Sequence, residues 1–330
     1  MQETRRQRVD PNSATLIAMA RCFVTRQLPG NQSDRIVAAG HDLDLWPKET
    51  PPPQDKLIAH AAQADALLCM LTDRIDAELL DAAPKLRVVS TMAVGYDNID
   101  VNACRQRGVL IGHTPDVLTE ATADLTLALL LALARRLPEG IAAVNDGSWS
   151  SWSPNWLLGV ELRDLTVGIV GPGRIGRAVS RRCGAFGMKV IESGRPGGER
   201  PGMPLNEMLA LADVVSIHCP LNDSTEALVS SEFLAAMKPT ALLVNTSRGG
   251  IVDQIALAKA LHNRTIAGAA LDVTTPEPLP PSDPLLNSPN LIVTPHLGSA
   301  TTRTREAMAT KAVDNLLAGL AGEPLPDCVT

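Results

Sequence analysis

Short apolar runs alternate with segments of helical spacing along most of the chain. Continuous runs of this length, without polar alternation, are typical of strands buried on both faces. Alternation of such strands with helices predicts a parallel, doubly wound α/β fold. The predicted strands are Arg21–Thr25, Ala66–Met70, Arg87–Thr91, Thr166–Val170, Val214–His218, Ala241–Asn245 and Leu291–Thr294, and helical spacing appears in Arg174–Phe186, Leu205–Leu211, Ser231–Met237 and Ile255–His262.

The most apolar stretch is Leu125–Ala134, which ends at two arginines. It is far shorter than the roughly 20 residues of a membrane-spanning helix, so we expect a buried helix. The residues before the first apolar run carry three arginines and no apolar core, unlike a secretory signal peptide. We therefore expect residues 1–14 to be a loose N-terminal extension and the protein to be cytoplasmic.

One long irregular stretch, Asn145–Arg163, contains three of the four tryptophans: Trp149, Trp152 and Trp156. Three such side chains within eight residues are too apolar for a solvated loop. We expect them to pack on a second surface, such as a partner subunit.

The composition of the chain disfavours several classes of function. A length of 330 residues suggests about two domains. A net charge of −6 and only 2% aromatic residues disfavour binding to nucleic acid or to an anionic membrane. The six cysteines form no C-x-x-C pair and no cluster with histidine, so we expect free thiols, no metal site and a reducing compartment.

A glycine-rich turn follows the predicted strand Thr166–Val170 and precedes a predicted helix. It reads Gly171-Pro172-Gly173-Arg174-Ile175-Gly176, a G-x-G-x-x-G pattern in the context that dinucleotide binding requires. The first glycine permits the tight turn, the second lets the backbone approach a pyrophosphate, and the third allows close packing of helix on strand. The amide groups at the helix N-terminus then favour phosphate.

The next predicted strand, Met188–Ile191, bears on the choice of nicotinamide cofactor. An acidic residue at its tip holds the ribose 2′-hydroxyl of NAD, and Glu192 is a candidate for that role. The tip itself is predicted at Gly194, flanked by Ser193 and Arg195, whose hydroxyl and guanidinium suit a 2′-phosphate. We favour NADPH, with NADH through Glu192 as the alternative.

Six ordered segments resemble motifs of the D-isomer-specific 2-hydroxyacid dehydrogenases, and the resemblance is closest to the glyoxylate/hydroxypyruvate reductase group. It covers nearly the whole chain from about Arg21. The segments are STMAVGYDNID (90–100), HTPDVLTEATAD (113–124), VGIVGPGRIG (167–176), VNTSRGGIVD (244–253), LDVTTPEPLP (271–280) and TPHLGSAT (294–301).

The resemblance implies two doubly wound parallel-sheet domains, with a Rossmann coenzyme domain inserted into a flavodoxin-like substrate domain. The substrate domain would comprise residues 15–111 and 299–330, and the NAD(P)-binding domain residues 112–298. An apolar helix from about Thr119 to Leu137 would connect the two. Family members form homodimers through the coenzyme domains, so we expect a homodimer here.

The same resemblance implies three catalytic residues. Arg248, in the segment TSRGG, would hold the carboxylate of a small 2-oxo acid with its planar fork. His296, in TPHLG, would donate a proton to the substrate oxygen as hydride reaches carbon. Glu277, in TPEPL, would hydrogen-bond the other ring nitrogen, orient it and favour its protonated form.

Further contacts follow from the resemblance. The substrate would also meet Leu71, the backbone amides of Val94 and Gly95, and Trp152, with Trp149 and Trp156 as competitors for the last position. The cofactor would contact residues of the glycine turn, of the next strand tip and of the strand ends beyond: Thr122, Gly171, Gly173, Arg174, Ile175, Gly176, Ser193, Gly194, Arg195, Cys219, Pro220, Thr225, Asn245, Thr246, Ser247, Asp272, Gly298 and Ser299.

The most direct hypothesis is an NADPH-dependent reductase that converts glyoxylate to glycolate and hydroxypyruvate to D-glycerate. A 2-ketogluconate reductase of the same family is an alternative, and so is a dinucleotide-sensing corepressor on the same scaffold. A relative of formate dehydrogenase is disfavoured, because Glu277 stands where that chemistry uses a glutamine beside the histidine.

Overall fold

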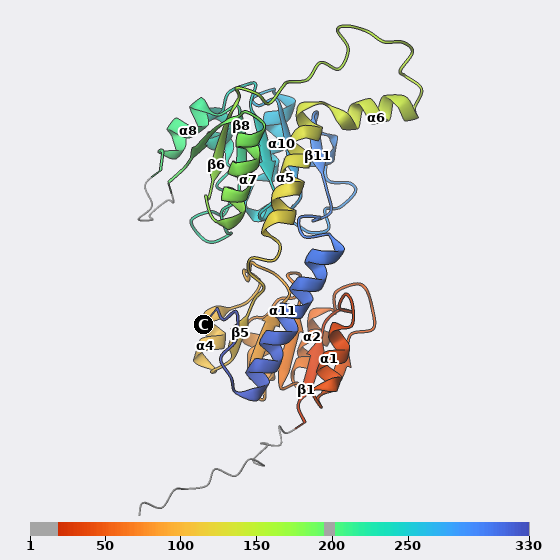
Figure 1. Cartoon of the computed structure of the whole chain (residues 1–330), viewed down its shortest axis with the longest axis vertical. Helices are drawn as coiled ribbons and strands as arrows, with labels where there is room; N and C mark the ends of the chain where they lie inside the picture. Colours follow the sequence, from red (N-terminus) through yellow and green to blue (C-terminus); the bar gives the residue numbers. More distant parts are fainter. Residues whose placement is uncertain (1–18, 195–201, 330) are drawn as a thin grey trace, which may run out of the picture. The chain divides into compact units, whose positions relative to one another are not determined.

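The computed structural model describes residues 19–194 and 202–329, which divide into two compact units. We call them the terminal unit, which runs to Thr114 and resumes at Ala309, and the central unit, Pro115–Met308. Each unit contains its own sheet (Figure 1). The sequence predicted a central domain of residues 112–298, so each predicted boundary lies earlier in the chain than the corresponding boundary of the central unit. The expected N-terminal extension, residues 1–14, lies outside the described residues.

The terminal unit contains a five-stranded parallel sheet in the order β2-β1-β3-β4-β5. Its strands are β1 (Arg21–Val24), β2 (Asp42–Leu45), β3 (Ala66–Cys69), β4 (Val88–Thr91) and β5 (Leu110–Gly112). Its helices are α1 (Gln32–Ala38), α2 (Gln54–Ala61), α3 (Ala77–Ala82), α4 (Val101–Gln106) and the C-terminal part of α11 (Thr302–Ala321). This strand order is the flavodoxin-like one.

The central unit contains a six-stranded parallel sheet in the order β11-β10-β9-β8-β6-β7. Its strands are β6 (Thr166–Val170), β7 (Lys189–Glu192), β8 (Val214–Ile217), β9 (Leu242–Asn245), β10 (Gly268–Leu271) and β11 (Leu291–Val293). Its helices are α5 (Thr119–Ala134), α6 (Leu137–Asn145), α7 (Arg174–Ala185), α8 (Leu205–Leu211), α9 (Ser231–Ala236) and α10 (Gln254–His262), with 3₁₀ turns η1 (Gly249–Ile251) and η2 (Pro284–Asn287).

The predicted fold class is confirmed: both sheets are parallel and each of the seven apolar runs contains a strand. The cores are aliphatic, as the shortage of aromatic residues requires. Most central strands are fully buried, which explains their continuous apolar runs. In the terminal unit the core includes Phe23, Leu67 and Val89, whereas Ile169, Val215 and Leu243 lie in the cores of the central unit.

The predicted helix Thr119–Leu137 is wrong at its end. The helix α5 ends at Ala134, and Arg136 adopts a left-handed conformation with a φ of 54°. A continuous helix would put Pro138 in its interior, where proline lacks the amide and its ring strikes the carbonyl four residues earlier. A new helix, α6, therefore begins at Leu137 and holds Pro138 in its first turn, where proline is tolerated.

The segment between α6 and β6 contains neither helix nor strand, as its sequence predicts. Figure 1 shows α6 and the chain after it projecting from the central unit. All six cysteines are free thiols, and Cys328 alone among them is exposed. Among the described residues, no helix is both long enough and apolar enough to cross a membrane.

Candidate active site

The glycine turn lies at the point where the strand order of the central sheet reverses. From β6 the chain passes to β7 on one side and then to β8 on the other, and doubly wound sheets bind ligands at such a point. Gly171 has a φ of 89°, and a Cβ there would lie 2.5 Å from the Cys219 amide nitrogen. A Cβ on Gly176 would lie 2.5 Å from the Gly171 carbonyl oxygen. Both positions therefore require glycine.

Gly173 differs from its two neighbours, because a Cβ there would meet no heavy atom within 4 Å. It is the N-cap of α7, so free amide groups face this open space. Steric needs of the fold do not demand glycine here, whereas close approach of a pyrophosphate does. The turn therefore fits a dinucleotide. Arg174 begins α7 and forms an ion pair of 2.6 Å with Asp116, while Ile175 packs against the core.

The tip of β7 has a buried serine. Ser193 is 3% exposed, and its hydroxyl lies 3.4 Å from the Ile169 carbonyl oxygen that it donates to. Glu192, the alternative ribose ligand, accepts a hydrogen bond of 3.2 Å from the Ser180 hydroxyl on α7. The Gly194 amide donates to the Met203 carbonyl. Arg195 lies outside the described residues.

Hydroxyl groups at the carboxyl ends of β8 and β9 hold the neighbouring loops. The Ser247 hydroxyl donates to the Cys219 carbonyl at 2.5 Å, and the Thr225 hydroxyl donates to the Pro220 carbonyl at 2.6 Å. The Thr246 hydroxyl lies 2.9 Å from that of Thr126 on α5. These predicted cofactor residues thus line the same edge of the sheet as the glycine turn, joined by their own hydrogen bonds.

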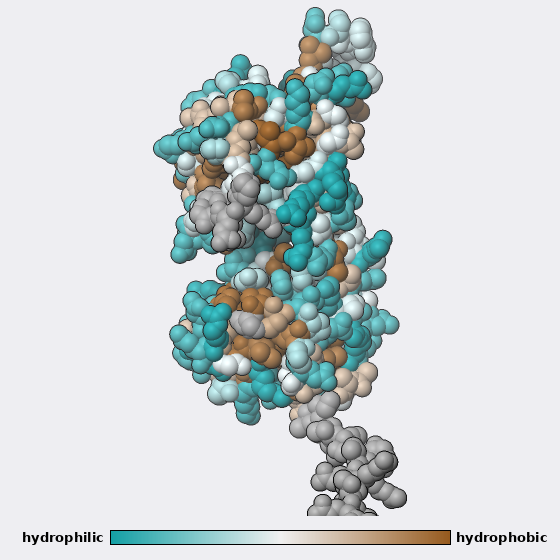
Figure 2. All heavy atoms as spheres, turned by 60° about the vertical axis from the view of Figure 1, so that its left-hand side comes forward, coloured by the Kyte–Doolittle hydropathy of each residue, from teal (hydrophilic) through white to brown (hydrophobic). Residues whose placement is uncertain are grey.

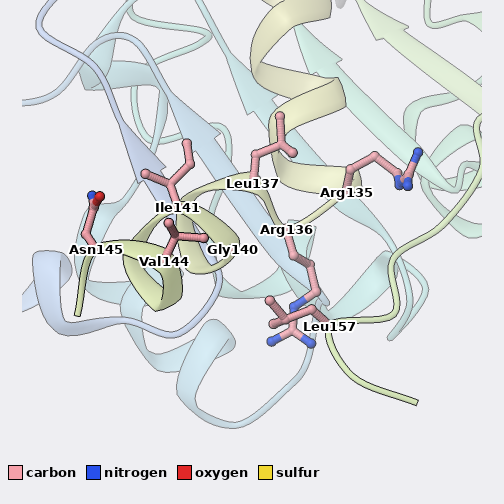
Figure 3. Close-up of a pocket in the computed structure, with 8 residues that line it drawn as sticks. All are labelled: Arg135, Arg136, Leu137, Gly140, Ile141, Val144, Asn145 and Leu157. Atoms are coloured by element: carbon pink, nitrogen blue, oxygen red, sulfur yellow. The ribbon is translucent and has the colours of Figure 1, made fainter. Parts of the chain in front are cut away.

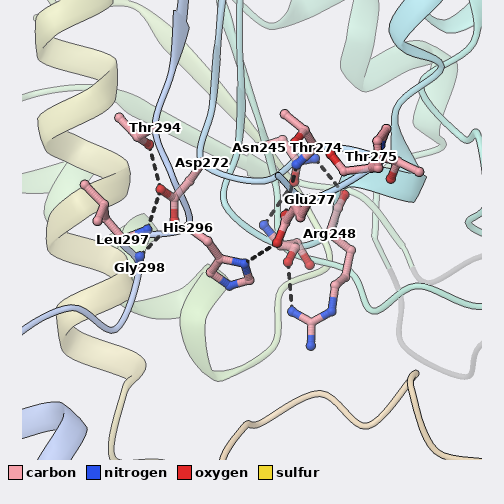
Figure 4. Close-up of polar contacts among 12 residues, drawn as sticks. Asn245, Arg248, Asp272, Thr274, Thr275, Glu277, Thr294, His296, Leu297 and Gly298 are labelled. Carbon is pink, nitrogen blue, oxygen red and sulfur yellow. Dashed lines mark hydrogen bonds and ion pairs between the residues drawn. The ribbon is translucent and has the colours of Figure 1, made fainter. Parts of the chain in front are cut away.

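Asn245 sets the turn that carries Arg248. Its fully buried amide nitrogen donates to the Arg248 carbonyl at 2.8 Å, and its amide oxygen accepts from the Ser247 backbone at 3.0 Å. The Arg248 guanidinium donates to the Ser247 carbonyl at 3.0 Å. The buried amide therefore fixes the backbone from which the guanidinium projects (Figure 4).

His296 and Glu277 form the centre of the site (Figure 4). The His296 Nδ1 lies 2.9 Å from Glu277 Oε2, and the Thr274 amide donates to Glu277 Oε1 at 3.0 Å. Burial raises the pKa of the Glu277 carboxyl, but the hydrogen bond and charge of His296, the Thr274 amide and the charge of Arg248 together bring it below its ordinary value. The carboxylate is therefore ionised near neutrality and orients the ring through Nδ1.

The loop that carries His296 is held by Asp272, at the end of β10. Its buried carboxylate accepts from the Thr294 hydroxyl at 2.6 Å and from the Leu297 and Gly298 amides at 2.7 and 2.8 Å. These bonds sustain a left-handed conformation at His296, whose φ is 55° and whose own amide donates to the Asp272 carbonyl. The sequence indicated a place for Asp272 beside the nicotinamide, but not this positioning role.

Thr122, Gly298 and Asp272 lie together beside this loop. The Thr122 hydroxyl donates to the Gly298 carbonyl at 3.2 Å, and a Cβ on Gly298 would lie 3.4 Å from both Thr122 Oγ1 and Asp272 Oδ2. Ser299 follows and is 9% exposed. The structure thus brings these four predicted cofactor residues to one place, next to the catalytic candidates.

A family model described as the NAD-binding domain of D-isomer-specific 2-hydroxyacid dehydrogenases matches residues 127–298, which include the glycine turn, Arg248, Glu277 and His296. The chain belongs to the D-isomer-specific 2-hydroxyacid dehydrogenase family. The resemblance seen in its motifs and the expected enzyme class are therefore confirmed.

Curated dehydrogenases of this family match almost end to end. A glyoxylate reductase from Korarchaeum cryptofilum is 46% identical over 94% of this chain and 95% of its own. A glyoxylate reductase/hydroxypyruvate reductase from Mus musculus is 44% identical over 93% and 97%. Among solved structures, a Thermus thermophilus protein superposes with a TM-score of 0.88 at 49% identity, over 94% of this chain and all of that one.

A further solved relative has ligands bound. The NADPH-dependent glyoxylate/hydroxypyruvate reductase of Sinorhizobium meliloti, in complex with NADP and malonate, has a TM-score of 0.82 and 33% identity over 95% of this chain and 97% of its own. In the present chain, the residues of the glycine turn fit such a dinucleotide. Among the described residues of the present chain, no group of three histidine, cysteine or acidic side chains could hold a metal ion.

The remaining predicted substrate residues of the dehydrogenase lie in loops. Leu71 follows β3, and Val94 and Gly95 follow β4, at the carboxyl edge of the terminal sheet. The Val94 carbonyl lies 3.0 Å from His113 Nδ1. Trp152 is 79% exposed in the irregular segment after α6, and Trp149 and Trp156 are exposed as well. Within one chain, Trp152 is thus available for contact with a second surface.

Apolar side chains also reach the surface of α6 in this dehydrogenase. A depression of about 390 Å³ lies along the helix (Figure 3), lined by Arg135, Arg136, Leu137, Gly140, Ile141, Val144, Asn145 and Leu157. The exterior is hydrophilic over much of the face in Figure 2, with apolar residues gathered in separate areas. The depression contains none of the catalytic candidates.

Proposed function

We propose that this dehydrogenase reduces a small 2-oxo acid with NADPH, converting glyoxylate to glycolate and hydroxypyruvate to D-glycerate. The observation that carries the proposal is the pairing of His296 with the Glu277 carboxylate beside Arg248. A cation for the substrate carboxylate and a proton donor for its oxygen are what a 2-oxo acid reduction needs. The names of the curated relatives support the same substrates.

In the proposed reaction, Arg248 pairs with the substrate carboxylate and withdraws electron density from the neighbouring carbonyl. The backbone amides of Val94 and Gly95 bind the same carboxylate, and Leu71 and Trp152 enclose the rest of the molecule. NADPH supplies the hydride when it is bound. His296 transfers the proton on Nε2 to the substrate oxygen, while Glu277 holds Nδ1 and stabilises the positive charge of the ring before transfer.

The preference for NADPH rests on the tip of β7. Glu192 pairs with Ile169 in the sheet register, two residues before Gly194, and its carboxylate is already bonded by Ser180. That arrangement favours Ser193 to Arg195 as the segment beside the ribose. The Ser193 hydroxyl is buried against the Ile169 carbonyl, so the Arg195 guanidinium is the group of this segment that suits a 2′-phosphate, which an acidic side chain repels. The NADP complex of the S. meliloti relative agrees with this preference.

We also propose a homodimer formed through the central unit and located in the cytoplasm. The support for the dimer is the exposed apolar face of α6: Leu137, Ile141 and Val144 are 50%, 60% and 61% exposed at helical spacing. The free state of all six cysteines suits a reducing compartment.

A spectrophotometric assay at 340 nm tests the reaction. NADPH and NADH are each combined with glyoxylate, hydroxypyruvate, pyruvate and 2-ketogluconate. We expect turnover of the first two acids, with a higher kcat/KM for NADPH than for NADH. Preference for 2-ketogluconate would identify the other reductase of this family, and equal use of both cofactors would overturn the NADPH assignment. Absence of turnover with every acid would overturn the proposed function and favour the corepressor hypothesis.

The variant His296→Ala tests the proton donor. Its kcat should fall by about 10²-fold or more, with NADPH affinity unchanged, because general acid catalysis contributes about that much. His262→Ala is the matched control, since His262 is an exposed histidine on α10. Unchanged turnover in His296→Ala would remove His296 from the reaction.

A further inference from the structure

Two loops of the terminal unit are joined along their length. One follows β3 and covers residues 70–76, and the other follows β4 and covers residues 92–100. The Ile75 amide donates to the Asn98 carbonyl at 2.9 Å, and the Asp100 amide donates to the Ile75 carbonyl at 2.8 Å. The loops therefore extend the parallel pairing of β3 with β4 beyond the strands.

The side chain of Asn98 adds a second connection nearer to the strand ends. Its amide nitrogen donates to the Met70 carbonyl at 3.1 Å and to the Asp73 carbonyl at 2.8 Å. One amide group thus binds the start and the middle of the first loop from a single position in the second. Loss of this group removes the donor to the Asp73 carbonyl and leaves the Met70 carbonyl with the Asp73 amide alone, which lets the loops separate.

Asp73 forms the buried base of the first loop. Its side chain is fully buried, and Oδ2 accepts from the Met70 amide at 2.7 Å and from the Thr25 hydroxyl at 2.5 Å. Oδ1 accepts no hydrogen bond and lies 3.7 Å from the Arg26 guanidinium. Burial raises the pKa of Asp73, although these bonds and Arg26 oppose the rise. Thr25 and Arg26 follow β1, so the ends of β1 and β3 meet at this carboxylate.

The proposed function assigns three half-buried residues of these loops to the substrate: Leu71 lies between Met70 and Asp73, and Val94 and Gly95 lie four and three residues before Asn98. We propose that Asn98 and Asp73 are positioning residues that hold these substrate-binding loops in register. This inference rests on the proposed function. Neither residue touches the substrate; each fixes the backbone that does.

Loss of register should affect substrate binding more than the chemical step. The candidate proton donor and cofactor residues belong to the central unit, whereas both loops belong to the terminal unit. A displaced loop therefore weakens the binding of the substrate carboxylate, which raises KM. The affinity for NADPH provides an internal reference that this displacement should not change.

The test compares Asn98→Ala with the control Asp65→Asn. Asp65 also bonds a backbone amide, that of Arg21 at 2.8 Å, but at the opposite edge of the same sheet. We expect Asn98→Ala to raise the KM for glyoxylate about tenfold or more, with kcat changed less than about threefold and NADPH affinity unchanged. Asp65→Asn should keep the KM of the unmodified protein. Thr25→Val removes only one donor to Asp73, so it should also raise KM, but by less than Asn98→Ala. It replaces Asn98→Ala in the test if that variant fails to fold.

Hydrogen exchange gives a readout that needs no turnover. Amides of residues 70–76 and 92–100 should exchange faster in Asn98→Ala, or in Thr25→Val, than in the unmodified protein, and not in Asp65→Asn. Unchanged KM together with unchanged exchange would overturn the positioning role. If the unmodified protein reduces no 2-oxo acid, the proposed function fails, and exchange alone then decides whether these residues hold the loops.

Discussion

At the residue scale, the surroundings of a side chain set its protonation. His218 is one such group, at the end of β8 behind the glycine turn, with its Nε2 2.8 Å from the Ser216 hydroxyl. Removal from water lowers its pKa to about 4. The ring is neutral in the folded protein above about pH 4, but in the unfolded protein it ionises near pH 6.5. Between these pH values, the folded protein therefore binds about one proton fewer than the unfolded protein.

Stability should therefore fall as the pH drops from about 6.5 towards 4, by about 1.4 kcal/mol per pH unit from this residue. Between pH 7 and pH 5, the unmodified protein should lose about 2 kcal/mol more of its free energy of unfolding than His218→Gln, measured by urea unfolding. His262→Gln, at an exposed histidine, should follow the unmodified protein. Parallel pH profiles for His218→Gln and the unmodified protein would contradict the prediction.

Motifs in the sequence predicted Arg248, Glu277 and His296 as catalytic candidates, because the proposed chemistry requires particular residue types. The residues that hold them were harder to predict. Asp272 fixes the His296 loop through a hydroxyl and two amides from a segment more than 20 residues later. Such bonds form because β10 and β11 pair in parallel, and the spacing of residues along the sequence does not reveal which strands pair.

At the element scale, the strands were predictable because burial on both faces leaves continuous apolar runs. The helix α6 was not, since the extended prediction for α5 absorbed its first residue and its apolar residues face outward. Periodicity indicates which residues share a face but not what covers it. The break between α5 and α6 follows from Pro138, whose position in a first turn becomes clear only when the left-handed Arg136 is seen.

The α7 N-terminus allows binding to be separated from folding. Ala at Gly173 meets no protein atom, so Gly173→Ala should leave the melting temperature within about 2 °C of the unmodified protein. The added methyl occupies the space through which a pyrophosphate approaches, so NADPH affinity, measured by fluorescence titration, should fall about tenfold or more.

Gly184→Ala is the matched control for that change, since Gly184 lies in the same helix and its Cβ would also meet nothing within 4 Å. It should bind NADPH normally and gain up to about 1 kcal/mol of stability, as a helical glycine replaced by alanine does. Normal NADPH affinity in Gly173→Ala would show that the cofactor does not approach the backbone there.

At the scale of the whole molecule, the exposed apolar residues of α6 and the segment after it require an explanation. Trp149 and Trp152 are 53% and 79% exposed, and the α6 face adds Ile141 at 60%. Several exposed apolar side chains in neighbouring segments are typical of an interface, and a projecting helix suits identical contacts made about a twofold axis. A second copy of the chain would also cover the depression beside α6.

The variant Ile141→Glu tests this interface, because a carboxylate at its centre would be buried without a partner. The unmodified protein should elute with twice the chain mass of 35.0 kDa in light scattering, and Ile141→Glu with that mass alone. Ile255→Glu is the control, since Ile255 on α10 is 71% exposed, and it should remain dimeric. If Trp152 encloses substrate across the interface, the monomer also shows a raised KM with unchanged NADPH affinity. If Ile141→Glu remains dimeric, the interface lies elsewhere, and the proposed contact of Trp152 with the substrate of a second chain through α6 is wrong.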